Sequence, residues 1–257
     1  QPTNFVKHQT VTRDAFLGGK LTLAQPRHGF RAGLDSVLLG SAVPEGCETL
    51  LDLGAGVGAA GLVALAYNRT QKADLAERDP ATLELTRANV VDNGFAERAR
   101  VFDVDVAAKG SIRRAAGIED NAYDVVIANP PYFGAGQGTL APETTRADAR
   151  HMELDALDLW VRCAASSARA GGTIIFVYPA DGLAQLLAAF DQRFGAITIL
   201  PLIPRPASAA TRILIRANKG SRAPLRLLAS RAIHGEEGNN FVPEFDSILR
   251  GEAVLDW

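Results

Sequence analysis

The segment VVIANPPYFGAG at residues 125–136 ends in an unusual way for a buried strand. Its apolar run stops at an amide residue, Asn129. The next residues are two prolines and two aromatic residues: Pro130, Pro131, Tyr132 and Phe133. Adjacent prolines fix the backbone, remove two N–H donors and exclude a helix. The sequence therefore predicts one amide side chain and one aromatic ring held rigidly at a strand end.

A glycine-rich turn, LDLGAGVGAAG at residues 51–61, gives a second chemical signal. It follows an apolar strand and opens an apolar helix, and Gly54, Gly56 and Gly58 permit tight turns and close approach of a ligand. Glu77 follows about twenty residues later at the end of the next predicted strand, where an acid can hold ribose hydroxyls. The glycine spacing also fits the dinucleotide fingerprint. The turn alone therefore does not separate a nicotinamide dehydrogenase from a methyltransferase.

Two aspartates complete the set of polar residues at strand ends. Asp52 stands just before the glycines, and Asp105 ends the third predicted strand in VFDVDV. With Asn129 after the fourth strand, these residues occupy successive strand ends, where ligands bind in parallel sheets. A dehydrogenase has no use for a rigid Asn-Pro-Pro-Tyr at that place. The ordered set favours a methyltransferase, although Asp105 could also be only a turn residue or helix cap.

Alternating strands and helices predict an α/β fold with a doubly wound, mostly parallel sheet. The predicted strands are 49–54, 73–79, 100–106, 123–129, 173–179, 197–203 and 211–219, and the last two form an antiparallel edge hairpin. Helices are predicted at 59–68, 80–94, 154–172 and 181–195, with a short one after Asp35. A small hairpin around Gly18 and Gly19 comes first. We divide the chain into residues 1–45, which cap the site, and the main domain, 46–257.

Composition excludes several function classes. The chain has 257 residues, 47% of them apolar, and a formal charge of −2, so no global basic field points to nucleic acid. The two cysteines, Cys47 and Cys163, are far apart, which argues against a disulfide framework or a structural zinc site and favours a reducing cytoplasm. No His-rich or carboxylate cluster indicates a metal. The apolar runs are too short to span a bilayer.

Taken together, these motifs resemble the class I S-adenosylmethionine-dependent methyltransferases. The Asn-Pro-Pro-Tyr tetrapeptide resembles those members that methylate an exocyclic or amide nitrogen. In that family the Asn oxygen and the first Pro carbonyl accept hydrogen bonds from the target NH₂, and the aromatic ring stacks on a flipped base. The resemblance implies that Asn129, Pro130 and Tyr132 are catalytic, with Pro131 and Phe133 on the substrate side.

The same resemblance implies the cofactor contacts. Asp52 and the backbone of residues 54–58 would hold the methionine moiety of S-adenosylmethionine, and Glu77 would hold its ribose. Asp105 would hydrogen-bond the adenine amino group, with Val106 offering its backbone N–H. Asn129 would also lie near the methionine amino group. The product left in the site would be S-adenosylhomocysteine.

Two further stretches resemble the bacterial tRNA adenine-N6 methyltransferases that modify the anticodon-loop adenosine of a valine tRNA. They are RHGFRAGLDSVLL at 27–39 and HGEEGNNFVPEFDSILRG at 234–251. The resemblance adds Gly33 and Asp35 as weaker cofactor candidates, although Asp35 could equally be an N-cap. Methylation of a protein glutamine, methylation of a ribosomal RNA base and a non-catalytic nucleotide-binding module remain as alternatives.

Basic residues cluster in two places that could meet RNA phosphates. Between Gln192 and Gly235 there are eight basic residues and no acid. Arg212 and Arg216 share one face of a predicted strand there, and a one-sided basic patch beside the site is what phosphate contacts require. The alternative is a solvated edge hairpin. A second cluster, with Arg146 and Arg150, reads as a mobile loop over the substrate or as a plain connector.

Overall fold

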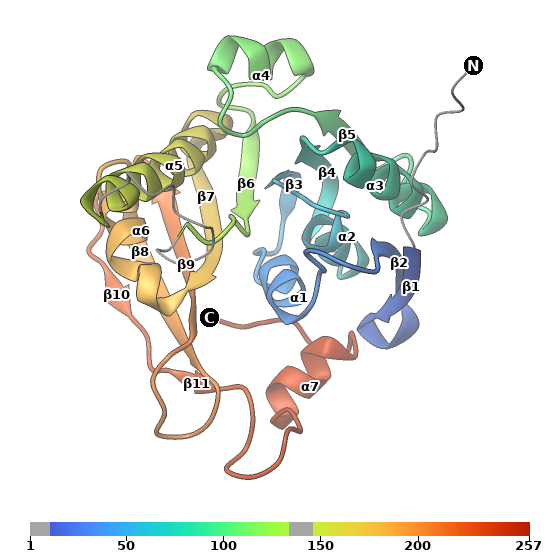
Figure 1. The fold of residues 1–257 in the computed structure, drawn as a ribbon, viewed down its shortest axis with the longest axis vertical. Coiled ribbons are helices and arrows are strands. Elements are labelled where there is room, and N and C mark those ends of the chain that lie inside the picture. Colours follow the sequence, from blue (N-terminus) through green and yellow to red (C-terminus); the bar gives the residue numbers. More distant parts are fainter. Residues whose placement is uncertain (1–10, 134–145) are drawn as a thin grey trace.

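The computed structural model describes residues 11–133 and 146–257, with the side chains of the second range from residue 151 onward. Its centre is one twisted sheet in the order β10-β8-β9-β7-β6-β3-β4-β5, with β11 also on β8 (Figure 1). The longer strands are β3 (Cys47–Leu53), β4 (Thr70–Glu77), β5 (Ala99–Asp103), β6 (Tyr123–Ala128), β7 (Ala168–Pro179), β8 (Phe194–Ile203) and β9 (Arg212–Lys219). β10 (Arg226–Leu227) and β11 (Arg231–Ala232) have two residues each.

The direction of the strands confirms the predicted doubly wound architecture. β9 runs antiparallel to both β7 and β8, whereas the other neighbouring strands of the sheet pair in parallel. The predicted C-terminal hairpin is therefore present, and its second strand, β9, is the inner one. Two short segments, β10 and β11, extend the sheet beyond β8, and the sequence analysis did not predict them.

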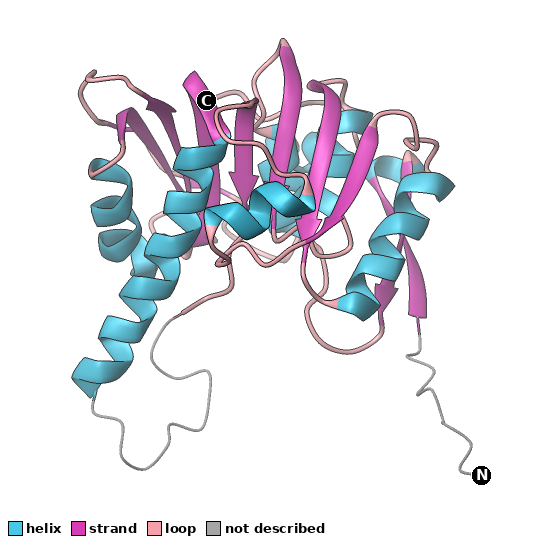
Figure 2. Ribbon diagram, turned by 90° about the horizontal axis from the view of Figure 1, so that it is seen from above, coloured by secondary structure: helices cyan, strands magenta, loops and turns pink. Residues whose placement is uncertain are grey.

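Helices cover both faces of the sheet, as Figure 2 shows. α1 (Leu34–Ser41), α2 (Ala59–Ala66), α3 (Pro80–Asp92) and α7 (Pro243–Leu249) pack into one apolar cluster, which the N-terminal hairpin also joins. α5 (Arg146–Ser167) and α6 (Leu183–Asp191) pack into the other, and α4 (Gly110–Ala116) borders it. Val125 and Ile127 of β6 belong to the first cluster and Val126 and Ala128 to the second. This two-sided burial explains the continuous apolar runs of the sequence.

Several element ends follow from local chemistry. Asp79 caps α3 by accepting a hydrogen bond from the Thr82 N–H, and Pro80 occupies the first turn, as predicted. Gly94 follows the helix with a φ of 76°. The N-terminal hairpin also forms as predicted: β1 (Val11–Phe16) and β2 (Leu21–Pro26) pair around η1 (Leu17–Gly19). Because the hairpin and α1 share a core with the sheet, the division at residue 45 stays a prediction.

Some predicted boundaries were wrong. α5 begins at Arg146 and not at residue 154, so Arg146 and Arg150 stand on a helix rather than in a mobile loop. The stretch from Arg146 to Leu154 is rich in helix-forming residues without glycine or proline, which explains the extension. The helix also ends earlier than predicted, because Ala168 already pairs with Tyr123. α4 was not predicted from the sequence.

Candidate functional site

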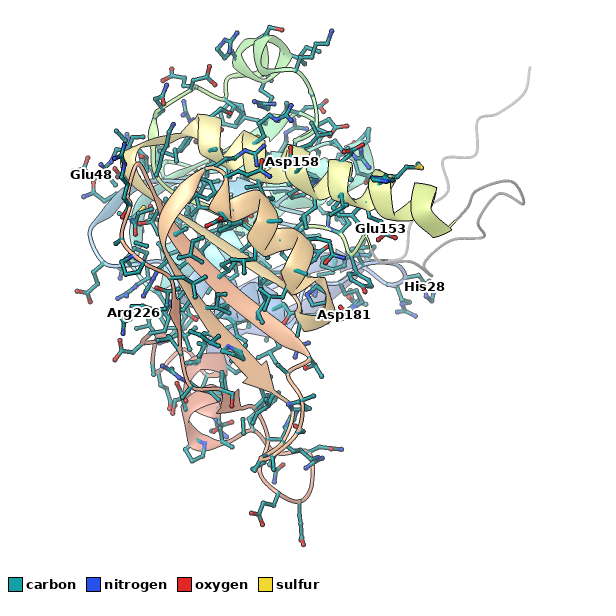
Figure 3. The ribbon with its side chains drawn as sticks, turned by 90° about the vertical axis from the view of Figure 1, so that its left-hand side faces the viewer. His28, Glu48, Glu153, Asp158, Asp181 and Arg226 are labelled. Atoms are coloured by element: carbon teal, nitrogen blue, oxygen red, sulfur yellow. The ribbon has the colours of Figure 1, made fainter. Side chains whose placement is uncertain are left out.

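The predicted polar residues meet at the carboxyl edge of the parallel strands. In the pairing register, Leu53 lies beside both Ala76 and Ala128. Gly54, Glu77 and Asn129 each come one residue later, so all three start from the same edge of the sheet. Figure 3 shows Asp181, Glu153 and His28 at one side of the molecule, and Glu48, near the start of β3, at the opposite side. The strand ends that carry the predicted residues therefore share one edge of the sheet, and their joint role as a site stays a prediction.

The glycine turn requires its glycines. Gly54, Gly56 and Gly58 have φ values of 64°, 57° and 90°, in the left-handed region that favours glycine. A Cβ on Gly54 would lie 2.3 Å from the Trp160 ring, whereas a Cβ on Gly56 would meet nothing within 4 Å. The backbone at Gly56 thus faces open space, which leaves room for a ligand. The Thr86 hydroxyl also donates to the Gly56 carbonyl at 2.6 Å, which holds the turn in place.

Glu77 is held by the backbone around it. One carboxylate oxygen accepts hydrogen bonds from the N–H groups of Arg78 and Asp79, at 2.8 and 2.9 Å. The other accepts from the Gly56 N–H at 2.9 Å, across the turn. A carboxylate has about four lone-pair positions, so ribose hydroxyls could still donate to it. These contacts orient Glu77 at the glycine turn, where the sequence placed it as a ribose ligand.

Asp105 has a different local setting from the one predicted. β5 ends at Asp103, so Asp105 lies just past the strand and not at its last position. Its carboxylate accepts from the Ala107 N–H at 2.9 Å, as in an Asx turn, and forms an ion pair of 3.0 Å with Arg78. The predicted turn role is thus real, and contact with adenine stays a proposal. Val106 is buried in the second core cluster.

The ion pair of Arg78 with Asp105 was not predicted, because nothing in a single sequence marks an arginine after a strand as the partner of a distant acid.

Asp52 is almost fully buried, whereas the sequence predicted that its side chain faces a ligand. Its side chain is 2% exposed and accepts a hydrogen bond from the Gly61 N–H at 2.9 Å, which ties β3 to the first turn of α2. Burial raises the pKa of this carboxyl to about 7, and the charge of nearby Glu77 adds to the rise, against the opposing effect of the Gly61 hydrogen bond. The contact of Asp52 in this structure is with the turn itself.

A pH dependence of stability follows from Asp52. Its folded pKa of about 7 lies above the ordinary value of 3.8, so between these values the folded state holds more protons than the unfolded state. The contribution of Asp52 to the free energy of unfolding is therefore fully present below about pH 4 and is lost as pH rises through 7. Urea unfolding should give a lower free energy of unfolding at pH 8 than at pH 5.5, and Asp52→Asn should remove this difference. The exposed Asp155→Asn should keep it, and an equal slope in both variants would contradict the assignment.

The segment at residues 129–132 leaves β6 at Ala128 and is anchored from β7. Asn129 is partly buried and Pro130 is buried, whereas Pro131 and Tyr132 are exposed. The Tyr132 hydroxyl donates to an Asp181 carboxylate oxygen at 2.8 Å, and the Phe133 N–H donates to the Tyr178 hydroxyl at 3.3 Å. The rings of Tyr132 and Tyr178 lie 6.0 Å apart, centroid to centroid. Sequence reasoning missed Tyr178 and Asp181, although a Tyr-Pro end on an apolar strand was visible.

Gly33 and Asp35 lie at the start of α1. The N-cap position belongs to Gly33, and Asp35 is inside the first turn, so the N-cap reading of Asp35 was wrong. The Asp35 carboxylate forms an ion pair of 2.5 Å with Arg212 Nε. Burial raises the pKa of Asp35, and the Arg212 charge opposes that rise. Because Arg212 pairs with Pro179 across the sheet, this ion pair stands at the same edge as the site.

The basic window of residues 192–235 is largely engaged within the chain. Arg216 lies over the Trp257 ring at 4.4 Å and donates to the Trp257 carbonyl at 2.8 Å, and burial lowers its pKa, with nearby Arg226 adding to the effect. Other members contact Asp158, Gly235, Asn121 and Glu244, through Arg193, Arg205, Lys219 and Arg231 respectively. Arg212 and Arg216 do share one strand face, as predicted. Their contact with phosphate stays a prediction, as does that of Arg146 and Arg150, whose side chains lie outside the described residues.

The N-terminal hairpin is tied directly to the glycine turn. The Asn89 side chain accepts from the Ala24 N–H at 2.7 Å and donates to the carbonyls of Ala24 and Val57, both at 3.0 Å. Asn89 is fully buried, so these three hydrogen bonds satisfy its amide without water. One buried side chain on α3 thus fixes β2 against the turn. The hairpin is therefore held beside the glycine turn, and its role as a cap over the cofactor stays a prediction.

Two classes of site find no support in the described part of the chain. Within residues 11–133 and 146–257, no three His, Cys, Asp or Glu side chains gather as metal ligands would. Among the helices in the same ranges, none combines the length and apolarity that a bilayer crossing requires.

The space over Gly56 is open, with the oriented Glu77 carboxylate and the end of β6, where Asn129 follows, nearby. This arrangement suits a nucleoside that carries a reactive group toward the end of β6. The fold and the site define an S-adenosylmethionine-dependent methyltransferase. Its seven longer strands lie in the order β5-β4-β3-β6-β7-β9-β8.

Comparison with known proteins gives the family. The model of the methyltransferase small domain matches residues 33–178, which is more than half of the chain. The chain belongs to this family. It is 32% identical over 200 residues to tRNA1(Val) (adenine(37)-N6)-methyltransferase of Aeromonas hydrophila, covering 76% of this chain and 79% of the relative. The enzyme of the same name from Pasteurella multocida is 30% identical over 229 residues, covering 87% and 90%.

A solved structure supports the same fold. The crystal structure of a predicted O-methyltransferase from Agrobacterium tumefaciens superposes with a TM-score of 0.71 and 31% sequence identity. The match covers 86% of this chain and 98% of that one. The similarity thus extends over most of this chain and nearly all of that one.

Proposed function

We propose that this enzyme transfers the methyl group of S-adenosylmethionine to the exocyclic N6 of an adenine in tRNA. The observation that carries the proposal is the rigid segment at residues 129–132, set beside the glycine turn with an exposed Tyr132 ring. The names of the relatives from Aeromonas and Pasteurella support the choice of tRNA adenine N6. The two free cysteines favour a cytoplasmic location for the same activity.

The target nitrogen explains why an amide stands at this strand end. An adenine N6 is planar and its lone pair is delocalised into the ring, so it is a weak nucleophile. The Asn129 side-chain oxygen and the Pro130 carbonyl would accept its two hydrogens, which favours a more pyramidal and electron-rich nitrogen. Bound S-adenosylmethionine supplies a methyl group that is already activated. The remaining work of the residues is to position the acceptor, which Tyr132 would do by stacking on the base.

The proposed methyl transfer does not require a strong base. In the proposed reaction the N6 lone pair would form the new N–C bond as the S–C bond of the donor breaks, which would leave S-adenosylhomocysteine. The methylated nitrogen is then cationic and loses its proton to water. His28 and His151 are both exposed, and neither is needed as a catalytic base.

The cofactor residues of the proposal are those whose geometry fits. Glu77 would hold the ribose, the backbone of residues 54–58 the methionine moiety, and Asp105 with the Val106 N–H the adenine. Asp52 would act through the turn that it holds, and its charge would favour the methionine ammonium group. Gly33 and Asp35 at the start of α1 would close the pocket from the other side.

One experiment tests the function directly. The protein is incubated with labelled S-adenosylmethionine and total tRNA from a strain that lacks the gene, and the labelled nucleotide is mapped by mass spectrometry. We expect label in N6-methyladenosine of a tRNA. Label only in ribosomal RNA, in a protein glutamine or in a hydroxyl group would replace the proposed substrate by that acceptor. The hydroxyl outcome matters because the Agrobacterium structure is called an O-methyltransferase.

The basic face of β9 gives a second prediction. If Arg212 and Arg216 contact phosphates, changing both to glutamine should raise the KM for tRNA. It should also reduce the slope of log KM against log salt by roughly 0.7–0.9 for each lost contact. If the ion pair with Asp35 and the stacking on Trp257 are their only roles, the melting temperature should fall and the salt slope should stay unchanged. Changing Arg114 and Arg162, which also form ion pairs but lie outside this basic window, to glutamine gives the control.

A further inference from the structure

Tyr132 is held by an acidic residue that the reaction chemistry does not require. Its side chain is 37% exposed, yet its hydroxyl donates to Asp181 at 2.8 Å. Asp181 belongs to η2 (Ala180–Gly182), directly after β7. We propose that Asp181 and Tyr178 are positioning residues that hold the Tyr132 ring ready to receive a base. The proposal rests on the proposed function.

The prolines do not fix the ring by themselves. Pro130 and Pro131 set the backbone that leads to Tyr132, but an exposed tyrosine still rotates about its side-chain bonds. Ordering that ring only when a base arrives would lower the affinity for RNA. A hydrogen bond to the hydroxyl and an adjacent ring restrict the rotation before binding. Asp181 supplies the first and Tyr178 the second, with ring centroids 6.0 Å apart and planes tilted by 60°.

The end of β7 is built to support both residues. The Ala180 N–H donates to the Thr211 carbonyl at 3.1 Å, which ties η2 to the start of β9. A Cβ on Gly182 would lie 2.3 Å from the Tyr178 ring, so a glycine is needed for that ring to pack against the turn. The Tyr178 hydroxyl accepts the Phe133 N–H at 3.3 Å, next to the stacking residue. Tyr178 at the end of β7 and Asp181 in η2 therefore contact two successive residues, Phe133 and Tyr132.

A double-mutant cycle tests the positioning role. Asp181→Ala and Tyr132→Phe should each raise the KM for tRNA by the same factor, roughly 3–10-fold as for loss of one hydrogen bond. The double variant should show no further increase, because both changes remove the same contact. Asp181→Asn should keep most of the affinity, since its amide oxygen still accepts from the hydroxyl. Asp191→Ala, at the exposed end of α6, should have no effect.

Additive effects in the double variant would overturn the proposal, as would an unchanged KM in Asp181→Ala. A readout without RNA separates this outcome from failure of the proposed function. In protein with ¹³C-labelled tyrosine, the couplings that report χ1 of Tyr132 should show averaging over rotamers in Asp181→Ala and a single rotamer in the wild type. If Asp181→Ala shows the averaging but no tRNA is methylated, the Tyr132–Asp181 contact is supported and the proposed substrate is wrong. No averaging would remove the contact itself.

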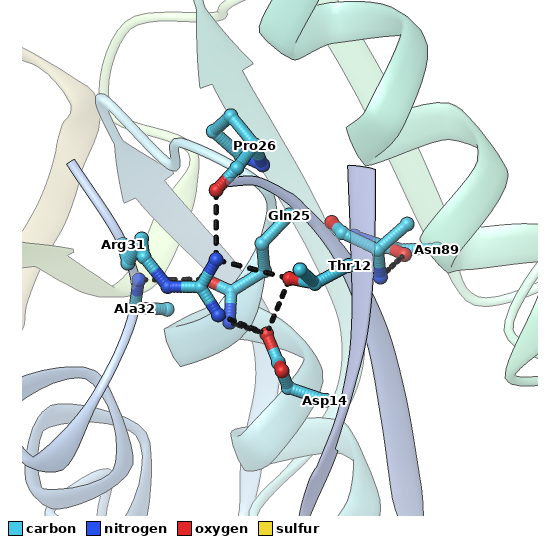
Figure 4. A network of polar contacts seen from close by, with 8 residues as sticks. Thr12, Asp14, Gln25, Pro26, Arg31, Ala32 and Asn89 are labelled. Carbon is cyan, nitrogen blue, oxygen red and sulfur yellow. Dashed lines mark hydrogen bonds and ion pairs between the residues drawn. The ribbon is translucent and has the colours of Figure 1, made fainter. Parts of the chain in front are cut away.

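A second and independent feature is a braced loop with an exposed aromatic tip. Residues 27–30 connect β2 to the segment before α1, and their two ends are held together by the polar network in Figure 4. The Gln25 side chain accepts from the Ala32 N–H at 2.8 Å, and the Arg31 guanidinium donates to the Pro26 carbonyl at 2.8 Å. Arg31 also pairs with Asp14 at 2.5 Å. The base of this loop is therefore fixed on the N-terminal hairpin.

The tip of the loop presents chemistry that suits single-stranded nucleic acid. Phe30 is 73% exposed, about twice the exposure of Tyr132, and Arg27 and His28 beside it are exposed as well. Leaving a phenylalanine in water on a braced loop gives no gain in stability. Aromatic rings next to cationic side chains are the common elements of single-strand binding, through base stacking and phosphate contact.

The loop also lies at the carboxyl edge of the parallel strands, where the candidate site is. On one side, Ala24 of β2 is joined through Asn89 to Val57 of the glycine turn. On the other side, Gly33 opens α1, whose Asp35 pairs with Arg212 at the carboxyl edge. Residues 27–30 therefore connect two points of the edge that carries Asn129. The geometry points to the Phe30 loop as a contact for RNA nucleotides next to the target base, on the premise of the proposed function.

Substitution and cross-linking test this surface. Phe30→Ala should raise the KM for tRNA about 5–30-fold, as for loss of one stacked base, and leave the affinity for S-adenosylmethionine unchanged. Ile112→Ala removes another exposed apolar side chain, 55% exposed on α4, and should change neither. A photo-reactive phenylalanine analogue at position 30 should cross-link to tRNA far more than one at position 112.

An unchanged KM, or equal cross-linking at both positions, would overturn the RNA contact. Cross-linking at position 30 without any methylation of tRNA would keep the contact and remove the proposed reaction. A fall in the affinity for S-adenosylmethionine in Phe30→Ala would instead assign the loop to the cofactor pocket.

Discussion

Changing Asn129 to alanine is expected to lower kcat by roughly 10²–10³, because in the proposed mechanism it removes one preorganised acceptor at the reacting centre. Affinity for S-adenosylmethionine should be largely spared, since the glycine turn and Glu77 remain. Asn129 is partly buried directly after the end of β6, where the proposed function puts the target nitrogen. Single-turnover kinetics with tRNA, together with calorimetric titration of the cofactor, measure the two effects separately.

Asn129→Asp is the matched variant for this experiment. Its carboxylate still accepts hydrogen bonds from an NH₂ group and should therefore retain more activity than alanine. A fully active Asn129→Ala enzyme would remove Asn129 from the mechanism. Equal loss in both variants would mean that the donor NH₂ of the asparagine matters and not its oxygen.

Gly54→Ala is expected to weaken cofactor binding and to destabilise the fold by about 2–4 kcal/mol, as the sum of two costs. The first is backbone strain at a φ of 64°, typically about 1 kcal/mol. The second is overpacking of about 1–3 kcal/mol, because the new Cβ would lie 2.3 Å from the Trp160 ring. Urea unfolding and calorimetry with S-adenosylhomocysteine measure both consequences.

Gly94→Ala separates the two costs. Gly94 also has a positive φ, 76°, but a Cβ there would meet nothing within 4 Å, so only the strain should appear. Trp160→Phe in the Gly54→Ala background should relieve the overpacking and leave a loss close to that of Gly94→Ala. If the double variant is as unstable as Gly54→Ala alone, contact with Trp160 is not the cause.

The strand ends were predictable because local sequence determines them. Apolar runs with a glycine turn or a proline pair at the end define where β3 and β6 stop, and parallel pairing then brings Gly54 and Asn129 together. The Pro80 start of α3 was predictable for the same reason. Such signals lie within a few residues of each other and need no knowledge of the rest of the fold.

The partners of the arginines could not be predicted. Asp35 and Arg212 are 177 positions apart in the sequence, and only the insertion of β9 between β7 and β8 brings them together. An acid-free stretch therefore resembled a free basic patch, although three of its eight basic side chains form ion pairs with acids outside the stretch and three more bond to neutral groups. The support of Tyr132 by Asp181 was hidden in the same way, because it depends on β6 and β7 being neighbours.

The inner position of β9 also has a consequence for synthesis on the ribosome. β7 leaves the ribosome well before β9, and β8 cannot pair with β7 because its place in the sheet is one strand further out. Until residue 219 has emerged, the apolar run from Ile174 to Tyr178 has one unpaired edge, which is a template for aggregation. A nascent chain stopped between β8 and β9 would thus be a natural client for a chaperone. The C-terminal third completes the sheet only when its last long strand arrives.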